Sequence, residues 1–243
     1  MSSITTDKCV IHTIHRSIHS TAGFWHLSLN PAPRIRRRRQ TSASLTDVDL
    51  SAGQLHGLNW ALSEAVCRGV DVDAADRVVS LSLDVLTLTD AGSTARPIVV
   101  SLTGVGRLAA SLRYQLWNDA EPTVERLELD QLSSAVASFG GCRLHGWEFI
   151  DLPDSSWTQW GHLLSLDTTL SDAPSAHVLE FTQEEGASPR ELDLRIWFDS
   201  VSIRSDDGEP ITVDDLVAGG VTWWSAHDAG DPRTLSDDIA PTL

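Results

Sequence analysis

Four short motifs occur twice, in the same order, in this chain of 243 residues. The paired motifs are Leu55-His56-Gly57 with Leu144-His145-Gly146, Ser82-Leu83-Asp84 with Ser165-Leu166-Asp167, Glu121-Pro122 with Glu209-Pro210, and Leu129-Asp130-Gln131-Leu132 with Val213-Asp214-Asp215-Leu216. The copies are 83 to 89 residues apart, and such colinear similarity is typical of an old internal duplication. The sequence therefore predicts two tandem similar units, at residues 55–141 and 144–243, that pack as one compact body.

Each expected unit consists of strands followed by one helix. In the first unit, apolar and polar residues alternate from Val79 to Val85, which is the period of a half-buried strand, and a helix is expected from Leu129 to Phe139. In the second unit, strand-like residues run from Glu191 to Ile203, and Thr212 and Asp215 have the spacing of a capping box at a helix start. Strands in succession followed by a helix predict an α+β fold with antiparallel sheets.

A basic tail precedes an acidic body. Residues 1–44 carry seven of the 18 basic residues and only one acidic residue, whereas residues 45–243 carry 33 acidic and 11 basic residues. The tail has no core-forming pattern, so we expect it to be disordered, either as an inert extension or as a leader from a mis-assigned start codon. A transit peptide, a contact with nucleic acid or with the acidic body, and a metal site on its histidines are the alternatives.

Composition excludes several classes of protein. No apolar run approaches the roughly 18 residues that a membrane-spanning helix needs, so no membrane contact is expected. The three cysteines show no CxxC spacing, which argues against a disulfide framework, a zinc motif or redox chemistry. We therefore expect a cytoplasmic protein without metal or cofactor. The excess of arginine over the single lysine indicates a GC-rich bacterial genome.

Motifs that carry a catalytic mechanism are missing from the sequence. There is no GxSxG elbow, HExxH pair, phosphate-binding GxxxxGK[ST] loop or GxGxxG turn, which favours a non-enzymatic protein. His56 and His145 stand at the same place in the two copies. Such a histidine acts either as a base or ligand, or as a structural residue that bonds a backbone carbonyl.

Tryptophan is unusually frequent, with nine residues against one tyrosine. Most tryptophans are expected in the core. Strand alternation, however, places Trp197 with Asp193 and Arg195 on the polar side of its strand. A ring among charged groups suits a surface that binds a cation, a sugar or a basic partner, unless another element covers it. The candidate binding residues are Trp197, Asp193, Arg195, Trp147 and His145.

Several segments of the body are similar to those of uncharacterised proteins from high-GC Gram-positive bacteria. These segments are Gly146-Trp147-Glu148-Phe149, residues 192–199, residues 219–224 and residues 230–234. The similarity extends from about Gln54 to the C-terminus and implies no particular activity.

Together these observations predict an acidic interaction protein that binds a basic protein partner. A strongly acidic body attracts a basic protein over long range and repels nucleic acid. An immunity-type inhibitor of a nuclease toxin is one example. The alternative is a small-molecule enzyme or ligand-binding protein with its site between the two units, near His145 and the tryptophans, because clefts between domains are preferred ligand sites.

Overall fold

The computed structural model describes residues 50–141, 143–149, 160–185 and 189–235. The chain divides into two units, Met1–Ser42 and Ala43–Leu243, and all the described residues belong to the second. The expected tail, residues 1–44, lies outside the described residues. Antiparallel sheets and a few helices make up the described part, so the predicted α+β class is confirmed at this level.

Helices and strands follow one another in a mixed order along the chain. Up to residue 141 these are α1 (Ala52–Leu62), β1 (Val66–Asp73), β2 (Val78–Thr89), β3 (Gly92–Thr103), β4 (Arg107–Tyr114), β5 (Thr123–Glu125), the short 3₁₀ helix η1 (Leu129–Gln131) and α2 (Leu132–Ala137). After it come β6 (Leu144–Phe149), β7 (Leu166–Thr169), β8 (His177–Glu184), β9 (Arg190–Phe198), β10 (Ser200–Ser205), β11 (Pro210–Ile211) and α3 (Val213–Asp228).

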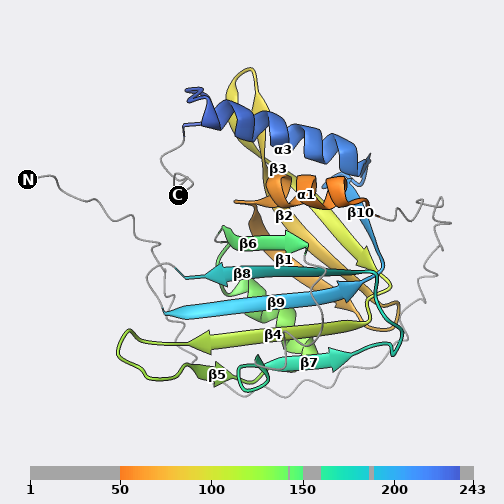
Figure 1. The fold of residues 1–243 in the computed structure, drawn as a ribbon, viewed down its shortest axis with the longest axis vertical. Coiled ribbons are helices and arrows are strands. Elements are labelled where there is room, and N and C mark those ends of the chain that lie inside the picture. The colour runs from red at the N-terminus through yellow and green to blue at the C-terminus, as the bar shows by residue number, and fades with distance from the viewer. Residues whose placement is uncertain (1–49, 142, 150–159, 186–188, 236–243) are drawn as a thin grey trace, which may run out of the picture. The chain divides into compact units, whose positions relative to one another are not determined.

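The strands form two antiparallel sheets that exchange strands between the two halves of the chain (Figure 1). Sheet A has the order β1-β2-β3-β10-β11, and sheet B has the order β5-β4-β9-β8-β6 with β7 also paired to β4. The chain crosses between the sheets after β3 and again after β9. The two crossings touch, because a Cβ added to Gly104 (φ +67°) would lie 2.2 Å from Asp199 Oδ2. Only glycine fits this left-handed and crowded position.

The strand orders of the two sheets correspond one to one. Written from its other edge, sheet B reads β6-β8-β9-β4-β5, which parallels β1-β2-β3-β10-β11 when β7 is treated as an insertion. The helices follow the same relation: α1 precedes β1 and contacts β6, whereas α2 precedes β6 and contacts β1. Along the chain, η1 and α2 also follow β1–β5, and α3 follows β6–β11, which is the order of strands and helix that the sequence predicted.

Two of the four repeated motifs do not occupy corresponding places. His56 lies in helix α1, whereas His145 lies in strand β6, and Ser82-Leu83-Asp84 lies in β2, whereas Ser165-Leu166-Asp167 lies at the start of β7. The predicted equivalence of these motifs is wrong, because a match of three residues does not specify secondary structure. The other two pairs do lie in comparable places. Glu121-Pro122 and Glu209-Pro210 stand at β5 and β11, and Leu129 and Val213 each begin a helix.

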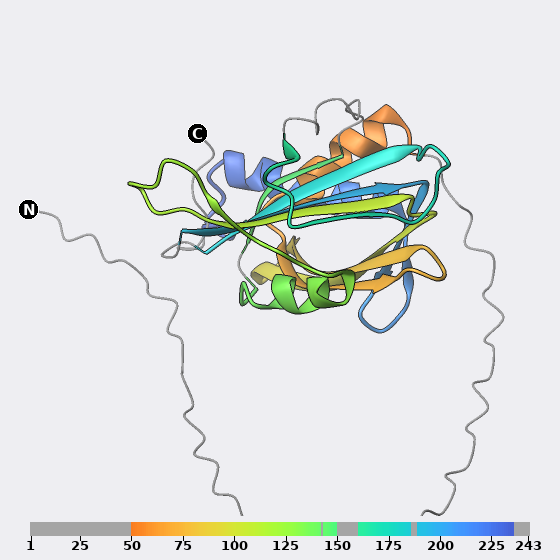
Figure 2. The same ribbon diagram turned by 90° about the horizontal axis from the view of Figure 1, so that it is seen from below.

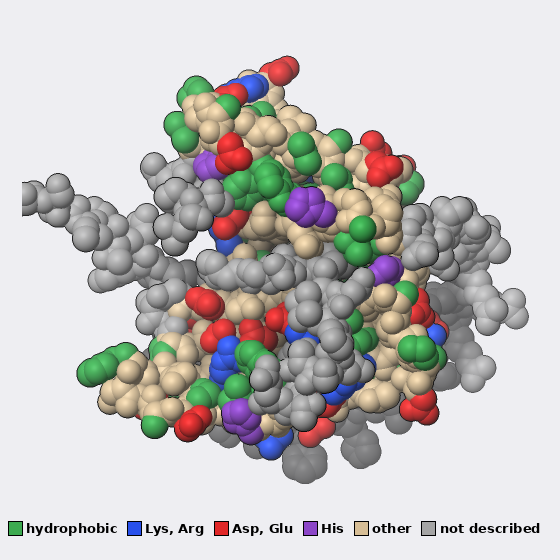
Figure 3. Space-filling model, in the orientation of Figure 1, with side chains coloured by type: hydrophobic (Ala, Val, Ile, Leu, Met, Phe, Trp, Pro, Cys, Tyr) green, Lys and Arg blue, Asp and Glu red, His purple; other side chains and the backbone are tan. Residues whose placement is uncertain are grey.

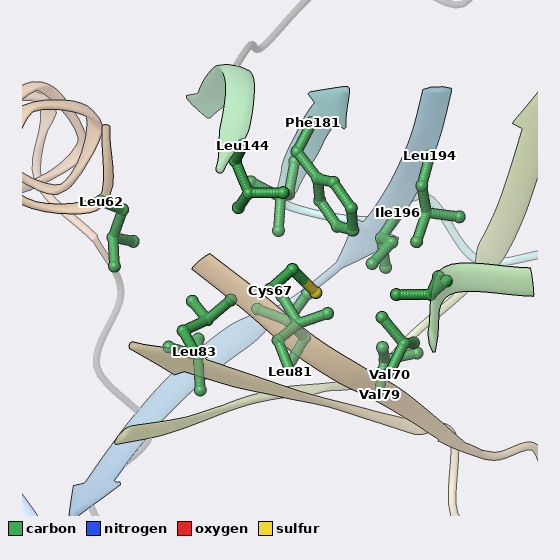
Figure 4. Close-up of a cluster of buried hydrophobic side chains, with 14 of the residues drawn as sticks. Leu62, Cys67, Val70, Val79, Leu81, Leu83, Leu144, Phe181, Leu194 and Ile196 are labelled. Carbon is green, nitrogen blue, oxygen red and sulfur yellow. The ribbon is translucent and has the colours of Figure 1, made fainter. Parts of the chain in front are cut away.

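The main hydrophobic core lies between the facing sides of the two sheets (Figure 2). Figure 4 shows Phe181, Leu194 and Ile196 of sheet B opposite Leu81 and Leu83 of sheet A. Each of these side chains is no more than 1% exposed, and burial of one such side chain stabilises the fold by about 1.5–3 kcal/mol.

Cys67 is one of the core residues in sheet A. Its side chain is 1% exposed, and burial raises the pKa of its thiol to about 11. A thiol with so high a pKa carries little nucleophilic thiolate at neutral pH. Cys67 is therefore a packing residue.

Helices α1 and α3 pack against each other at two glycines. A Cβ on Gly57 would lie 2.4 Å from Val217 Cγ1, and a Cβ on Gly220 would lie 2.4 Å from Ala61 Cα. The predicted start of α3 is confirmed, since Thr212 Oγ1 accepts a hydrogen bond from the Asp215 backbone N–H at 3.0 Å. Among the described residues, no helix is long and apolar enough to cross a bilayer.

Candidate functional site

The outer face of sheet B carries three of the residues that the sequence singled out. Asp193, Arg195 and Trp197 alternate along β9 with Leu194 and Ile196, which point into the main core. All three are nearly covered, at 6%, 6% and 7% exposure. Of the two alternatives for Trp197, coverage by other residues is therefore the correct one.

Asp193 belongs to a network of paired charges on this face. Arg113 donates to Asp193 Oδ2 and to Glu191 Oε1, both at 2.5 Å. The other oxygen of Asp193 accepts a hydrogen bond from Thr182 Oγ1 at 2.7 Å. Buried charges are tolerated when they are paired and hydrogen-bonded in this way, and removal of one partner is costly.

Arg195 and Trp197 are also engaged. Arg195 Nε donates to Glu180 Oε2 at 2.6 Å. The Arg107 guanidinium lies 4.7 Å from the centroid of the Trp197 ring and forms two hydrogen bonds of 2.8 Å to Asp167. The Trp197 ring therefore packs beneath a cation that the protein itself supplies. It also lines a cavity of about 350 Å³ beside the loop that joins β7 to β8.

The remaining predicted residues are placed only in part. The side chains of His145 and Trp147 lie outside the described residues, although their backbone belongs to β6. His56 is exposed on α1, with its ring centroid 6.3 Å from that of Trp60. Within the described ranges, no group of His, Cys, Asp and Glu residues is arranged to hold a metal ion.

The loop between β4 and β5 presents an aromatic side chain that sequence reasoning missed. Trp117 is 97% exposed, and Tyr114 and Leu116 beside it are each 42% exposed. Figures 1 and 2 both show this loop projecting at one end of sheet B. The available signal was an apolar pair, Leu116-Trp117, directly before the turn-forming Asn118-Asp119.

A closed turn fixes the backbone on either side of this tryptophan. The Leu116 backbone N–H donates to Asp119 Oδ2 at 2.8 Å, and the Asp119 N–H donates to the Leu116 carbonyl at 3.0 Å. Gln115 Nε2 adds a hydrogen bond to the Asp119 carbonyl at 3.3 Å. Because the backbone at the tip is fixed, Trp117 can contact a partner with little loss of backbone entropy.

An acidic groove lies between this loop and the ends of β8 and β9. It encloses about 430 Å³ and is lined by Leu116 and Trp117 on one side and by Glu184, Glu185 and Glu191 on the other. Figure 3 shows acidic side chains over the strands of sheet B and hydrophobic ones at the projecting tip. We call the loop tip and these three carboxylates the Trp117 groove.

Negative charge is in excess within the Trp117 groove. Burial raises the pKa of Glu191, and the charges of Asp193 and Glu184 add to this effect, while Arg113 opposes it. Glu185 is paired with Arg190 at 3.1 Å. No cation of the described residues pairs with Glu184. The groove therefore favours an incoming positive group.

Comparisons of the chain with models of protein families, with curated proteins and with solved structures found no match.

Proposed function

We propose that the chain is a non-enzymatic interaction protein whose acidic body binds a basic protein partner. The observation that carries the proposal is Trp117, 97% exposed on a closed turn beside the carboxylates of the groove. Tryptophan is among the residue types most enriched in binding hot spots, and a backbone that is already fixed loses little entropy on binding. Trp117 lies beside Tyr114 and Leu116, each 42% exposed, and a contiguous exposed apolar patch is typical of an interaction site.

Charge selects the kind of partner. The body carries three times as many acidic as basic residues, 33 against 11. Such a surface accelerates encounter with a basic protein and repels nucleic acid and other anions. We propose the cytoplasm as the compartment in which the two meet.

The alternative, a small-molecule site near the tryptophans, has weaker support. The cavity beside Trp197 is lined by Arg107, but this guanidinium already forms a bidentate pair with Asp167. The neighbouring charges of Arg113, Asp193 and Arg195 are also paired. Such a network is typical of a structural face, since a binding site presents groups that still need a partner.

We also infer that the chain consists of two tandem units, residues 55–141 with β1–β5 and residues 144–243 with β6–β11. The corresponding strand orders and the reciprocal contacts of α1 with β6 and of α2 with β1 support this inference.

The test is to identify the partner and measure its charge. A photoreactive amino acid at position 117 of the full chain, with one at position 206 as control, is cross-linked in the cells that encode the protein. The cross-linked protein is then purified and its association rate with the full chain measured at several salt concentrations. We expect a basic protein whose association slows as salt rises. The proposal is contradicted if the cross-linked partner is a neutral or acidic protein or a nucleic acid, or if the amino acid at position 117 gives no cross-linked product.

A further inference from the structure

We infer that the Trp117 groove recognises an extended, arginine- or lysine-bearing segment of the partner, with one cationic side chain seated between the Trp117 ring and the carboxylates of Glu184 and Glu185. This inference rests on the proposed function and names the surface and chemical group through which it operates.

The two walls of the groove offer complementary interactions to one cation. The loop supplies an indole face, to which a guanidinium or ammonium group is attracted by the ring quadrupole. The other wall supplies carboxylates at the end of β8 and the start of β9. A cavity of about 430 Å³ is within the range of sites that hold small groups.

The basic residue already in the groove does not fill this role. Arg190 Nη1 donates to both Glu185 Oε1 at 3.1 Å and Ser138 Oγ at 2.9 Å, and its guanidinium lies 4.7 Å from the Phe139 ring centroid. These contacts draw the Arg190 side chain toward α2. An incoming cation therefore meets Glu184 and the exposed Trp117 ring, while Glu185 Oε1 keeps its hydrogen bond to Arg190.

Charge also disfavours two other occupants of the exposed apolar tip, the acidic body of a second copy and a membrane surface. The body of a second copy, residues 45–243, would bring a second acidic surface against this one, and like charges across an interface oppose association. A membrane surface is disfavoured because anionic headgroups attract basic, not acidic, segments. A basic peptide segment satisfies both the aromatic tip and the carboxylates.

The experiment uses a fluorescent nine-residue peptide in which four arginines alternate with serines between terminal glycines. Alternate residues of an extended peptide point to the same side, so its arginines share one face. Binding to the full chain is measured by anisotropy at physiological salt. A second peptide with citrulline in place of arginine keeps the shape and removes the charge.

Substitutions in the groove test whether the arginine peptide binds there. We expect Trp117→Ala to weaken peptide binding about tenfold, as for a hot-spot residue. Glu184→Gln and Glu185→Gln should each weaken it about threefold, as for exposed ion pairs. Asp206→Asn and Val221→Ala, which change an exposed acid and an exposed apolar residue elsewhere, should alter it less than about twofold, because salt screens distant charges.

The outcomes separate this inference from the proposed function. The groove is not the recognition site if the arginine peptide does not bind. The same holds if that peptide binds the wild type and Trp117→Ala equally, or if the citrulline peptide binds as tightly as the arginine peptide. The proposed function survives those results if the cross-linked cellular partner is basic. If the wild type self-associates and Trp117→Ala does not, the tip binds a second copy. If the wild type binds phosphatidylserine vesicles and Trp117→Ala does not, the tip binds a membrane. Either result would also overturn the inference.

Discussion

The corresponding ends of the two sheets differ in what covers them. At sheet A, the β2–β3 hairpin is closed by the C-terminal end of α3, where Trp223 Nε1 donates to Ser93 Oγ at 2.8 Å and the Ser93 N–H donates to the Arg233 carbonyl at 2.9 Å. At sheet B, the β8–β9 hairpin borders the open Trp117 groove. Trp223 is 0% exposed and Trp117 is 97% exposed. One end is thus closed by α3, whereas the other leaves the Trp117 ring exposed.

The segments that follow the two hairpins explain the difference. After β11 the chain continues directly into α3, a helix of 16 residues that packs on α1 and β2. After β5 it continues into η1 and the six-residue α2, which packs on β1. The long helix reaches the hairpin of sheet A. At sheet B, among the described residues, the end of α2 meets the start of β9 through the Ser138–Arg190 hydrogen bond and leaves Trp117 97% exposed.

The largest expected effect distinguishes the covered tryptophan from the exposed one. Trp223→Ala should lower the free energy of unfolding by about 3–5 kcal/mol, because it removes a fully buried ring and leaves a cavity. Trp117→Ala should change it by less than about 0.5 kcal/mol, since the ring touches mainly water. Urea denaturation measures both. A large loss of stability in Trp117→Ala would remove the contrast between the two ends.

A second prediction compares two tryptophans of sheet B. Trp197→Ala should cost about 3 kcal/mol of folding stability, because the ring is buried against Ala109 and Val178 and beneath Arg107. Binding of the arginine peptide should stay within about twofold of the wild type if the variant is folded. A small loss of stability together with a large loss of affinity would instead restore Trp197 as the binding residue that the sequence suggested.

Local patterns in the sequence predicted much of this architecture, whereas features that depend on long-range contacts could not be predicted from them. The alternation along β9 and the cap at Thr212 depend on neighbouring residues, so both are readable. Alternation gives the face on which Trp197 lies but not what covers that face. The exchange of strands between sheets depends on pairings such as that of β4 with β9, about 85 residues apart, which no local period encodes.

The Trp117 groove escaped prediction for a related reason. Its walls come from the β4–β5 loop and from the ends of β8 and β9, so no single segment contains the site. The repeated histidines drew attention instead, although His56 lies on a helix and His145 on a strand. Repetition of a short motif is weak evidence when the two secondary structures are unknown.

A third prediction tests how α3 is held over sheet A. Gly220→Ala should destabilise the protein by about 1–3 kcal/mol, because its Cβ would lie 2.4 Å from the Cα of Ala61 and would force α1 and α3 apart. Gly219→Ala is the matched control, since no atom lies within 4 Å of the new Cβ, and it should stabilise the helix by about 0.5–1 kcal/mol. Thermal unfolding of both variants checks the sign of each effect. Equal shifts would show that close helix packing does not secure the covered end.

The smallest effect concerns the pH dependence of binding at the open end. Burial holds the pKa of Glu191 above its ordinary value of 4.5 in the free protein, and a bound cation would lower it. Binding therefore releases protons, and affinity for the arginine peptide should rise with pH through the range just above 4.5. Glu191→Gln removes this titration, so the ratio of wild-type to variant affinity should be near one at low pH and grow as the pH increases. Anisotropy titrations between pH 4.5 and 7.5, with Asp206→Asn as the control carboxylate, measure the ratio. A ratio independent of pH would mean that the cation does not reach Glu191, and would confine recognition to Trp117, Glu184 and Glu185.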